Sequence, residues 1–441
     1  MYKRQQPTTE AQVVDIVKDA ATRGECVRTT GAGHSFSQIL ATADTLVNLD
    51  KLAGNITVNG TRATVPGGMR LKDLIPALRQ RGLAFRNIGS VTEQSIAGAF
   101  STGTHGTGLR LGNISTQVVG VKMVTGTGDV RTIDETELDL LNAVRINVGA
   151  LGIITEVTLE CVPDYKLEYT AYLTTFDHVI DKIDTLTAEN ERVLFWWLLP
   201  PFGPRNKVVV ITKNPIGHPK GILGNATPSL LDLAGGLFAR AFPRDVMGLP
   251  GVALDVLTNQ SDGFRKIVSF TADYDDVLTI PLLPVFHREC EYAIPVEHTA
   301  DALKGFRTVV DEGDMSLILP VEVRFLAKDN IPISPSLGRD VCYIGASTLH
   351  NATEVFERFE PLMTRLGGRP HWGKNFTLTR DDFDEMYPGT LCLLYTSDAA
   401  DERSSVDLGG RRIIKKKKKT EQTVARSSNR SKGTQQQRTR I

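Results

Sequence analysis

Two glycine-rich loops hold the side chains of this sequence whose types and spacing suit ligand binding. The first loop, TTGAGHSFS (residues 29–37), follows a β-branched run, and its candidate binding residues are Gly31, Ala32, Gly33, His34 and Ser35. Glycines at positive φ let successive backbone N–H groups point into one concave nest, which binds an anion such as a diphosphate. A glycine-rich loop that only reverses the direction of the chain would have the same composition. This loop alone therefore leaves open whether it binds an anion or is a simple turn.

The second loop, SIAGAFSTGTHGTGLRLGN (residues 95–113), lets the backbone approach a flat ligand because few of its side chains are large. Its candidate ligand-lining residues are Ser101, Thr102, Gly103, Thr104, His105 and Gly106. A glycine-rich core loop is the alternative interpretation, with His105 only a hydrogen-bonded loop residue. A third segment, NVGALGIITEV (residues 147–157), includes Ile154 and by itself indicates close packing.

Three further candidates lie in the second half of the chain. In VEVRF (residues 321–325), Glu322 and Arg324 fall on one face of a predicted strand because strand side chains alternate with period two. Taken alone, such a pair is usually a solvated ion pair, and Lys374 in HWGKNF (residues 371–376) is by default a surface lysine.

The elements that must position these loops alternate between helix and strand. Up to about residue 163, helical spacing predicts helices at 8–24, 71–82 and 136–144, and β-branched runs predict strands at 26–30, 45–49, 56–68 and 153–162 with a hairpin at 118–133. From residue 166, strands are expected at 193–199, 207–212, 287–294, 319–326 and 341–347, and helices at 297–312 and 352–366. We also expect a helix-like stretch between the first two of these strands. This order predicts a sheet covered by helices on one side.

Four segments, VRTTGAGHSFS, AGAFSTGTHGTG, ALGIITEVTL and HWGKNF, occur in an order and spacing that resemble the FAD-binding (PCMH-type) vanillyl-alcohol oxidase family. The closest resemblance is to its sugar-1,4-lactone oxidase branch, which includes gulonolactone oxidase, arabinonolactone oxidase and alditol oxidase. It covers residues 6–390. The resemblance implies an α+β fold, with a two-subdomain FAD-binding α/β domain (6–163) followed by a substrate domain (166–390).

The resemblance also implies FAD as the cofactor and assigns residues to it. It puts the FAD diphosphate against residues 31–35 and makes His34 the residue whose ring nitrogen bonds the flavin 8α-methyl group. Some relatives have another residue there and bind FAD without the bond. Residues 101–106 would line the flavin, and Ile154 would meet the adenine or ribose through backbone groups.

For the reaction, the resemblance places Glu322 and Arg324 on substrate hydroxyl groups over the flavin. A cation at Lys374, beside the N1–C2=O edge, would stabilise the charge that develops there on reduction. The implied activity is hydride transfer from an alcohol carbon of a sugar-1,4-lactone to flavin N5, with O2 or another electron acceptor. An open-chain alditol oxidase is the alternative enzyme. A flavin-binding protein without turnover is the alternative of another class.

The composition is that of an ordinary globular protein. There is no run of about 18 apolar residues and no secretory signal, so we expect no transmembrane segment. The five cysteines, at 26, 161, 290, 342 and 392, are widely separated and show no metal-ligand spacing. They predict neither a metal nor a disulfide framework and fit a reducing compartment, either cytoplasmic or organellar.

The C-terminal segment is strongly basic, since residues 403–441 hold 13 Lys and Arg against 2 Asp and Glu. Such a block is typical of a nucleic-acid arm. However, CLLYTSDAADE (392–402) can be encoded by a sequencing-library adapter, and MYKRQ (1–5) by the same adapter on the opposite strand. We therefore predict that residues 1–5 and 391–441 are non-native, that the natural chain differs at both ends, and that no nucleic acid is bound.

Overall fold

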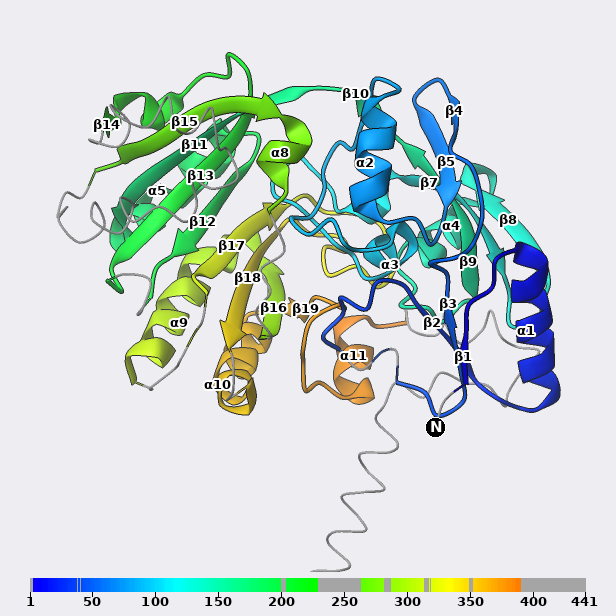
Figure 1. Ribbon diagram of the computed structural model, residues 1–441. Coiled ribbons are helices and arrows are strands. Elements are labelled where there is room, and N and C mark those ends of the chain that lie inside the picture. The colour runs from blue at the N-terminus through cyan, green and yellow to red at the C-terminus, as the bar shows by residue number, and fades with distance from the viewer. Residues whose placement is uncertain are drawn as a thin grey trace, which may run out of the picture.

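The computed structural model describes residues 3–37, 39, 41–199, 204–228, 263–280, 287–312, 317, 319–348 and 352–389. Its elements form two groups that lie side by side, the N-terminal group in blue and cyan and the second group in green to orange (Figure 1). The predicted non-native segment 391–441 lies outside the described residues. Among the described residues, no helix combines the length and apolar character that a membrane crossing requires.

The first helix, α1 (Glu10–Thr22), shows how the N-terminal sequence determines local structure. Thr9 caps it by accepting a hydrogen bond from the Gln12 N–H, and its apolar face is buried at Val13 and Val17. The following Gly24 has a φ of 63°, a conformation that favours glycine and ends the helix. This confirms the helix predicted for residues 8–24.

Two sheets carry the cofactor loops of the N-terminal group. The smaller is parallel, in the order β1 (Lys3–Gln5), β3 (Thr45–Asn48) and β2 (Val27–Thr30). The larger is antiparallel, in the order β4 (Thr57–Asn59), β5 (Arg62–Pro66), β9 (Ile153–Glu160), β7 (Val118–Val124) and β8 (Val130–Asp134).

Helices and short elements complete this group. The helices are α2 (Leu71–Arg79), α3 (Ile96–Ser101) and α4 (Leu138–Arg145), with short 3-10 turns at Ile114–Gln117 and Glu135–Glu137. Strands β6 (Leu83–Ala84) and β10 (Val162–Pro163) pair with each other. The predicted N-terminal elements are therefore present, with shifted ends.

Among the described residues, the second group is built on one nine-stranded sheet, which is antiparallel except for its β14 edge. Its order is β14 (Thr227–Pro228), β15 (Arg265–Asp273), β11 (Lys166–Thr175), β13 (Lys207–Pro215), β12 (Val193–Trp197), β17 (Val321–Leu326), β18 (Val341–Thr348), β16 (Arg288–Pro295) and β19 (Arg369–Pro370).

One face of this sheet is covered by the helices α5 (Phe176–Glu189), α9 (Thr299–Glu312) and α10 (Ala352–Arg365), as Figure 1 shows. The opposite face packs against the N-terminal group, because residues such as Leu194 and Ile211 share one apolar cluster with α2 and α3. Shorter elements are α8 (Tyr274–Leu278), α11 (Arg380–Met386) and 3-10 turns at Gly221–Asn225 and Val296–His298.

The α+β architecture and the helix-covered sheet are confirmed, although several described elements differ from the predicted ones. Strand β11 and helix α5 were not predicted, and neither were α3, β15, α8 and α11. The apolar residues of α5 follow helical spacing, so this helix could have been found from the sequence. The helix-like stretch expected between β12 and β13 is wrong in its described part, where Lys207 N–H closes a turn on Pro204 O. The domain limits at 163 and 166 stay a prediction.

Candidate active site

A cleft of about 790 Å³, partly open to solvent, lies in the N-terminal group. It joins three segments that are far apart in the sequence, 29–35, 94–102 and 147–154. The candidate cofactor residues that line it are Gly31, Ala32, Gly33, His34, Ser35, Ser101, Thr102 and Ile154. The other candidates, Gly103, Thr104, His105 and Gly106, continue the chain from this cleft toward β17, where Gly108 forms a bridge with Leu326.

Positive φ angles favour glycine at two positions in the wall of the cleft. Gly33 and Gly149 have φ values of 74° and 75°, and a Cβ on either would meet no atom within 4 Å. Since both residues line the cleft, a side chain there would project into open space. Gln94 lines the same cleft, and its buried Oε1 has no partner among the described residues. These features fit a bound cofactor with a diphosphate and a flat, hydrogen-bonding ring.

His34 is partly buried in this cleft and favours the neutral imidazole. Burial lowers its pKa, and the positive charges of Arg70 and Lys374 lower the pKa further, against the opposing effect of Glu93. A neutral imidazole keeps one nitrogen lone pair, which a nucleophile requires.

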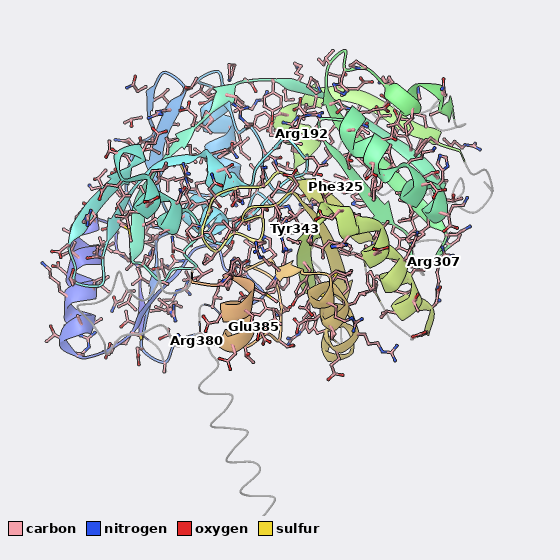
Figure 2. All side chains as sticks on the ribbon, turned by 180° about the vertical axis from the view of Figure 1, so that it is seen from behind. Arg192, Arg307, Phe325, Tyr343, Arg380 and Glu385 are labelled. Atoms are coloured by element: carbon pink, nitrogen blue, oxygen red, sulfur yellow. The ribbon has the colours of Figure 1, made fainter. Side chains whose placement is uncertain are left out.

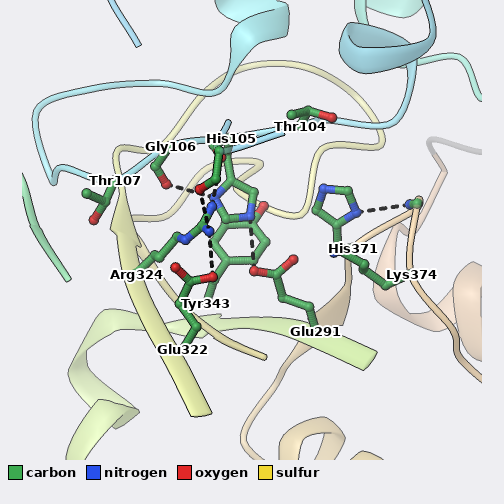
Figure 3. Close-up of polar contacts among 12 residues, drawn as sticks. Thr104, His105, Gly106, Thr107, Glu291, Glu322, Arg324, Tyr343, His371 and Lys374 are labelled. Atoms are coloured by element: carbon green, nitrogen blue, oxygen red, sulfur yellow. Dashed lines mark hydrogen bonds and ion pairs between the residues drawn. The ribbon is translucent and has the colours of Figure 1, made fainter. Parts of the chain in front are cut away.

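Glu322 and Arg324 lie on the face of the nine-stranded sheet that is turned toward the N-terminal group (Figure 3). Arg324 Nη2 donates to Glu322 Oε2 at 2.5 Å and to Ser90 Oγ at 2.9 Å, and Nη1 donates to the backbone oxygen of His105 at 3.2 Å. Burial lowers the pKa of Arg324, but Glu322 and Glu291 outweigh burial and raise it. Arg324 therefore stays charged and joins the two groups of elements.

His105 is fixed in place by a second acid. Its Nδ1 lies 2.9 Å from Gly106 O and its Nε2 lies 3.4 Å from Glu291 Oε1, while its ring stacks on Tyr343 with centroids 3.7 Å apart. Tyr343 is fully buried near the middle of the molecule, as the view from behind shows (Figure 2). Both ring nitrogens therefore face acceptor oxygens, which fixes the orientation of the His105 ring.

Lys374 forms a third acid–base pair in this region. Its Nζ donates to Glu289 Oε2 at 2.5 Å and lies 5.3 Å from the ring centroid of Phe36. Burial lowers the pKa of Lys374, but Glu289 and Glu291 outweigh burial and raise it. The candidate cation is thus partly buried and paired, unlike a surface lysine.

His371 lies in a cluster with His105 and Glu291, and the spacing of these residues in the sequence did not predict the cluster. The metal-ligating atoms of His105, Glu291 and His371 lie within 4.8 Å of one another. Burial lowers the pKa of His371 to about 3, so the ring is neutral, and its Nδ1 accepts a hydrogen bond from the Gly373 N–H at 3.0 Å. Its proton must then sit on Nε2, which blocks that nitrogen as a ligand. We therefore interpret the cluster as a hydrogen-bonded acid–base network.

Sequence reasoning missed several residues of this face. Glu289 and Glu291 alternate along β16 in RECEYAIP, the same period-two signal that identified Glu322 and Arg324, and could have been found by it. Lys213, on β13, gave no local signal. It is buried, and burial together with the Arg324 charge lowers its pKa to about 7, although Glu322 opposes this.

Comparison with known proteins identifies the family. Residues 157–393 match the profile described as D-arabinono-1,4-lactone oxidase, and residues 5–134 match that of an FAD binding domain. The chain belongs to the D-arabinono-1,4-lactone oxidase family. The predicted resemblance to the sugar-1,4-lactone oxidases is thereby confirmed, and so are an FAD-binding domain and an oxidoreductase class.

Relatives of this D-arabinono-1,4-lactone oxidase family member match it along most of their length. The L-gulono-1,4-lactone dehydrogenase of Mycobacterium tuberculosis is 32% identical over 397 residues, which cover 87% of this chain and 88% of the relative. The L-gulonolactone oxidase of Bos taurus is 30% identical over 401 residues, with the same coverage. Among solved structures, cholesterol oxidase from Brevibacterium sterolicum superposes with a TM-score of 0.65 at 16% identity, covering 85% of this chain and 83% of that one. This likeness shows a shared fold.

Proposed function

We propose that this protein oxidises an alcohol carbon of a sugar-1,4-lactone to a carbonyl, with FAD held in the cleft as hydride acceptor. The observation that carries the proposal is the position of Arg324. Its guanidinium reaches from strand β17 to Ser90 and to the backbone of His105, three residues after Thr102 of the glycine-rich cleft. Relatives named for gulono- and arabinono-lactones favour this substrate class over open-chain alditols.

Glu322 and Arg324 have distinct roles in this proposal. Arg324 remains protonated and has several N–H donors, so it orients the lactone hydroxyl groups. Glu322 already accepts from Arg324, and Trp196 Nε1 lies 3.4 Å from its other oxygen. It is the group of this pair that can take the hydroxyl proton while the hydride leaves carbon, since Arg324 cannot accept one.

We further propose that His34 bonds covalently to the flavin and that Lys374 lies beside the flavin edge that becomes negative on reduction. FAD, when bound, supplies the two-electron acceptor for the hydride. The neutral imidazole of His34 and its place in the cleft support covalent attachment. The electron acceptor is dioxygen or another oxidant, because relatives carry the names of both oxidases and dehydrogenases.

An anaerobic titration of the purified yellow protein tests the activity. L-gulono-1,4-lactone or D-arabinono-1,4-lactone should bleach the visible flavin absorbance, whereas xylitol should do so far more slowly. Admitting air then reports whether dioxygen restores the colour. Bleaching by xylitol alone would establish the alditol alternative, and bleaching by neither substrate class would indicate a flavin-binding protein without turnover.

Acid precipitation tests the covalent bond separately. The wild-type precipitate should remain yellow, and His34→Ala should release all flavin into the supernatant. A colourless wild-type precipitate would rule out covalent attachment while leaving the lactone activity open.

A further inference from the structure

The loop that carries His34 is held by a segment more than 330 residues away in the sequence. Phe36 N–H donates to Gly373 O at 2.8 Å, and Phe36 O accepts from Asn375 Nδ2 at 2.9 Å. Ser37 Oγ adds a bond to Trp372 O at 2.7 Å. Both backbone polar groups of Phe36, two residues after His34, are therefore satisfied by the HWGKN segment (residues 371–375).

The HWGKN segment is itself anchored to the substrate sheet. His371 N–H donates to Glu291 O at 2.9 Å and Asn375 N–H donates to Glu289 O at 2.8 Å, which extends the edge of β16. The Trp372 ring stacks on Phe383 of α11 with centroids 4.8 Å apart. Its Nε1 donates to Ile333 O at 2.7 Å. The segment is thus a rigid link between β16 and the His34 loop.

We propose that Asn375 is a positioning residue for covalent flavin attachment, acting by fixing the Phe36 carbonyl and thereby the direction of the His34 ring. This inference rests on the proposed covalent role of His34. Three hydrogen bonds join the HWGKN segment to Phe36 and Ser37, and the one from Asn375 uses a side chain of that segment, so a substitution there removes it. The others to Phe36 and Ser37 involve backbone atoms of the HWGKN segment.

Attachment places strict demands on the position of His34. When FAD is bound, attachment would join a His34 ring nitrogen to the 8α carbon, with loss of one proton from the methyl group and one from the imidazole. The two electrons released would pass through the flavin to the electron acceptor of the proposed reaction. Reacting atoms must lie within about 3–3.5 Å and be aligned, and a misplacement of about 1 Å can slow a step on the order of 10²-fold.

The same segment also carries Lys374, whose ammonium lies over the Phe36 ring. Loss of the Asn375 bond is therefore expected to loosen the His34 loop without removing the cleft walls, which come from residues 94–102 and 147–154 as well. Non-covalent FAD binding should survive, whereas the rate of covalent bond formation should fall.

The test compares Asn375→Ala with Thr377→Ala, an exposed neighbour whose side chain bonds Glu360 outside the link. Protein made with limiting flavin is incubated with FAD, samples are acid-precipitated over time, and the flavin in the precipitate is measured. Attachment should be about tenfold slower or more in Asn375→Ala and unchanged in Thr377→Ala. An unchanged rate in Asn375→Ala would overturn the inference.

A second measurement separates positioning from a general loss of structure. The Kd for FAD is compared between His34→Ala and His34→Ala/Asn375→Ala, neither of which can form the bond. The two values should agree within about threefold, and a larger loss in the double variant would overturn the positioning role. A wild-type protein without covalent flavin would overturn both the role of His34 and this inference. An unchanged attachment rate in Asn375→Ala would overturn this inference but leave the covalent role of His34 intact.

Discussion

At the scale of single residues, the candidate site consists of partly or fully buried acidic and basic side chains held in pairs. Lys374 pairs with Glu289, His105 with Glu291, and Arg324 with Glu322. Removing such groups from water costs several kcal/mol per ion, roughly, so buried pairs are weak contributors to stability. We propose a functional role for these pairs, because each can shift its balance when charge develops nearby.

Substitution of Lys374 and substitution of Glu289 should shift the flavin reduction potential in opposite directions, because the two side chains carry opposite charges. Lys374→Ala removes a positive charge, so it should lower the flavin reduction potential and slow anaerobic reduction on the order of 10²-fold. Glu289→Gln removes the compensating negative charge and should raise the potential. Dye-coupled potentials and stopped-flow bleaching measure both effects. If the potential shifted in the same direction in both variants, the proposal that Lys374 lies beside the flavin would be wrong.

Arg324 supplies a second prediction, because its planar fork contacts three acceptors at once. A lysine keeps the charge but cannot reach Ser90, Glu322 and the His105 carbonyl together. Arg324→Lys should raise KM for the lactone about tenfold, equivalent to about 1.4 kcal/mol, with a smaller change in kcat. Steady-state kinetics under saturating acceptor test this. A fall in kcat at constant KM would instead assign Arg324 to the transition state alone.

Residue types and spacing predicted part of this site. The strand pattern of VEVRF placed Glu322 and Arg324 on one face, and the glycines marked the cleft. The partners of Arg324 could not be predicted, because Ser90 and the His105 carbonyl come from loops about 220 residues or more away in sequence. Lys213 could not be found either, since its environment exists only after the sheet forms.

At the scale of elements, sequence patterns gave most helices and strands of the N-terminal half but not the strand order of the large sheet. In that sheet β17 pairs with β12 and β18, whereas β16 lies beyond β18. Periodicity within a strand carries no information on its neighbours. The register across β17, β18 and β16 aligns Glu322, Gly345 and Glu291 in one row, which is how two acids of separate strands meet at one site.

Lys213 of strand β13 is a buried lysine near Arg192, Arg324 and Glu322, and its burial predicts a pH-dependent stability. Its pKa is lowered to about 7 in the folded protein, against about 10.4 in an unfolded chain. Between these pH values the unfolded chain binds the extra proton, so the free energy of unfolding rises with pH across this window. The cost of the buried charge is greatest below about pH 7.

Lys213→Met should therefore raise Tm by several degrees at pH 6, and the gain should shrink toward pH 10. Thermal melts of the flavin-loaded protein at both pH values measure this. Lys304→Met, on the exposed side of α9, is the matched control and should show no such pH dependence. An equal gain at pH 6 and pH 10 would mean that packing, rather than charge, determines the effect.

At the scale of the whole molecule, the N-terminal group and the nine-stranded sheet are joined by hydrogen bonds close to the candidate site. Gly108 N–H donates to Phe325 O at 2.6 Å, and Gly108 forms a parallel bridge with Leu326, so the second glycine-rich loop pairs with β17 at this residue. Asn113 Nδ2 donates to Asp329 Oδ2 at 2.9 Å farther along. The sequence predicted two halves and their order, but this junction depends on loop backbone atoms that have no sequence signature.

Thr107 is the residue through which this junction can be tested. Its hydroxyl donates to Val193 O at 2.5 Å and accepts from Phe325 N–H at 3.1 Å, and it is 4% exposed. Thr107→Val keeps the shape but leaves a carbonyl of β12 and an N–H of β17 without this partner, at a cost of about 1–3 kcal/mol for each group left unpaired.

Since Phe325 adjoins Arg324, Thr107→Val should lower Tm and raise KM for the lactone together, while the flavin content stays at the wild-type level because the cleft walls are untouched. Thr308→Val, an exposed position whose hydroxyl donates to Lys304 O of its own helix, is the matched control and should change neither quantity. A Thr107→Val protein with reduced stability but an unchanged KM would show that the junction supports the fold without positioning Arg324. Loss of flavin at unchanged stability would place Thr107 in the cofactor site instead.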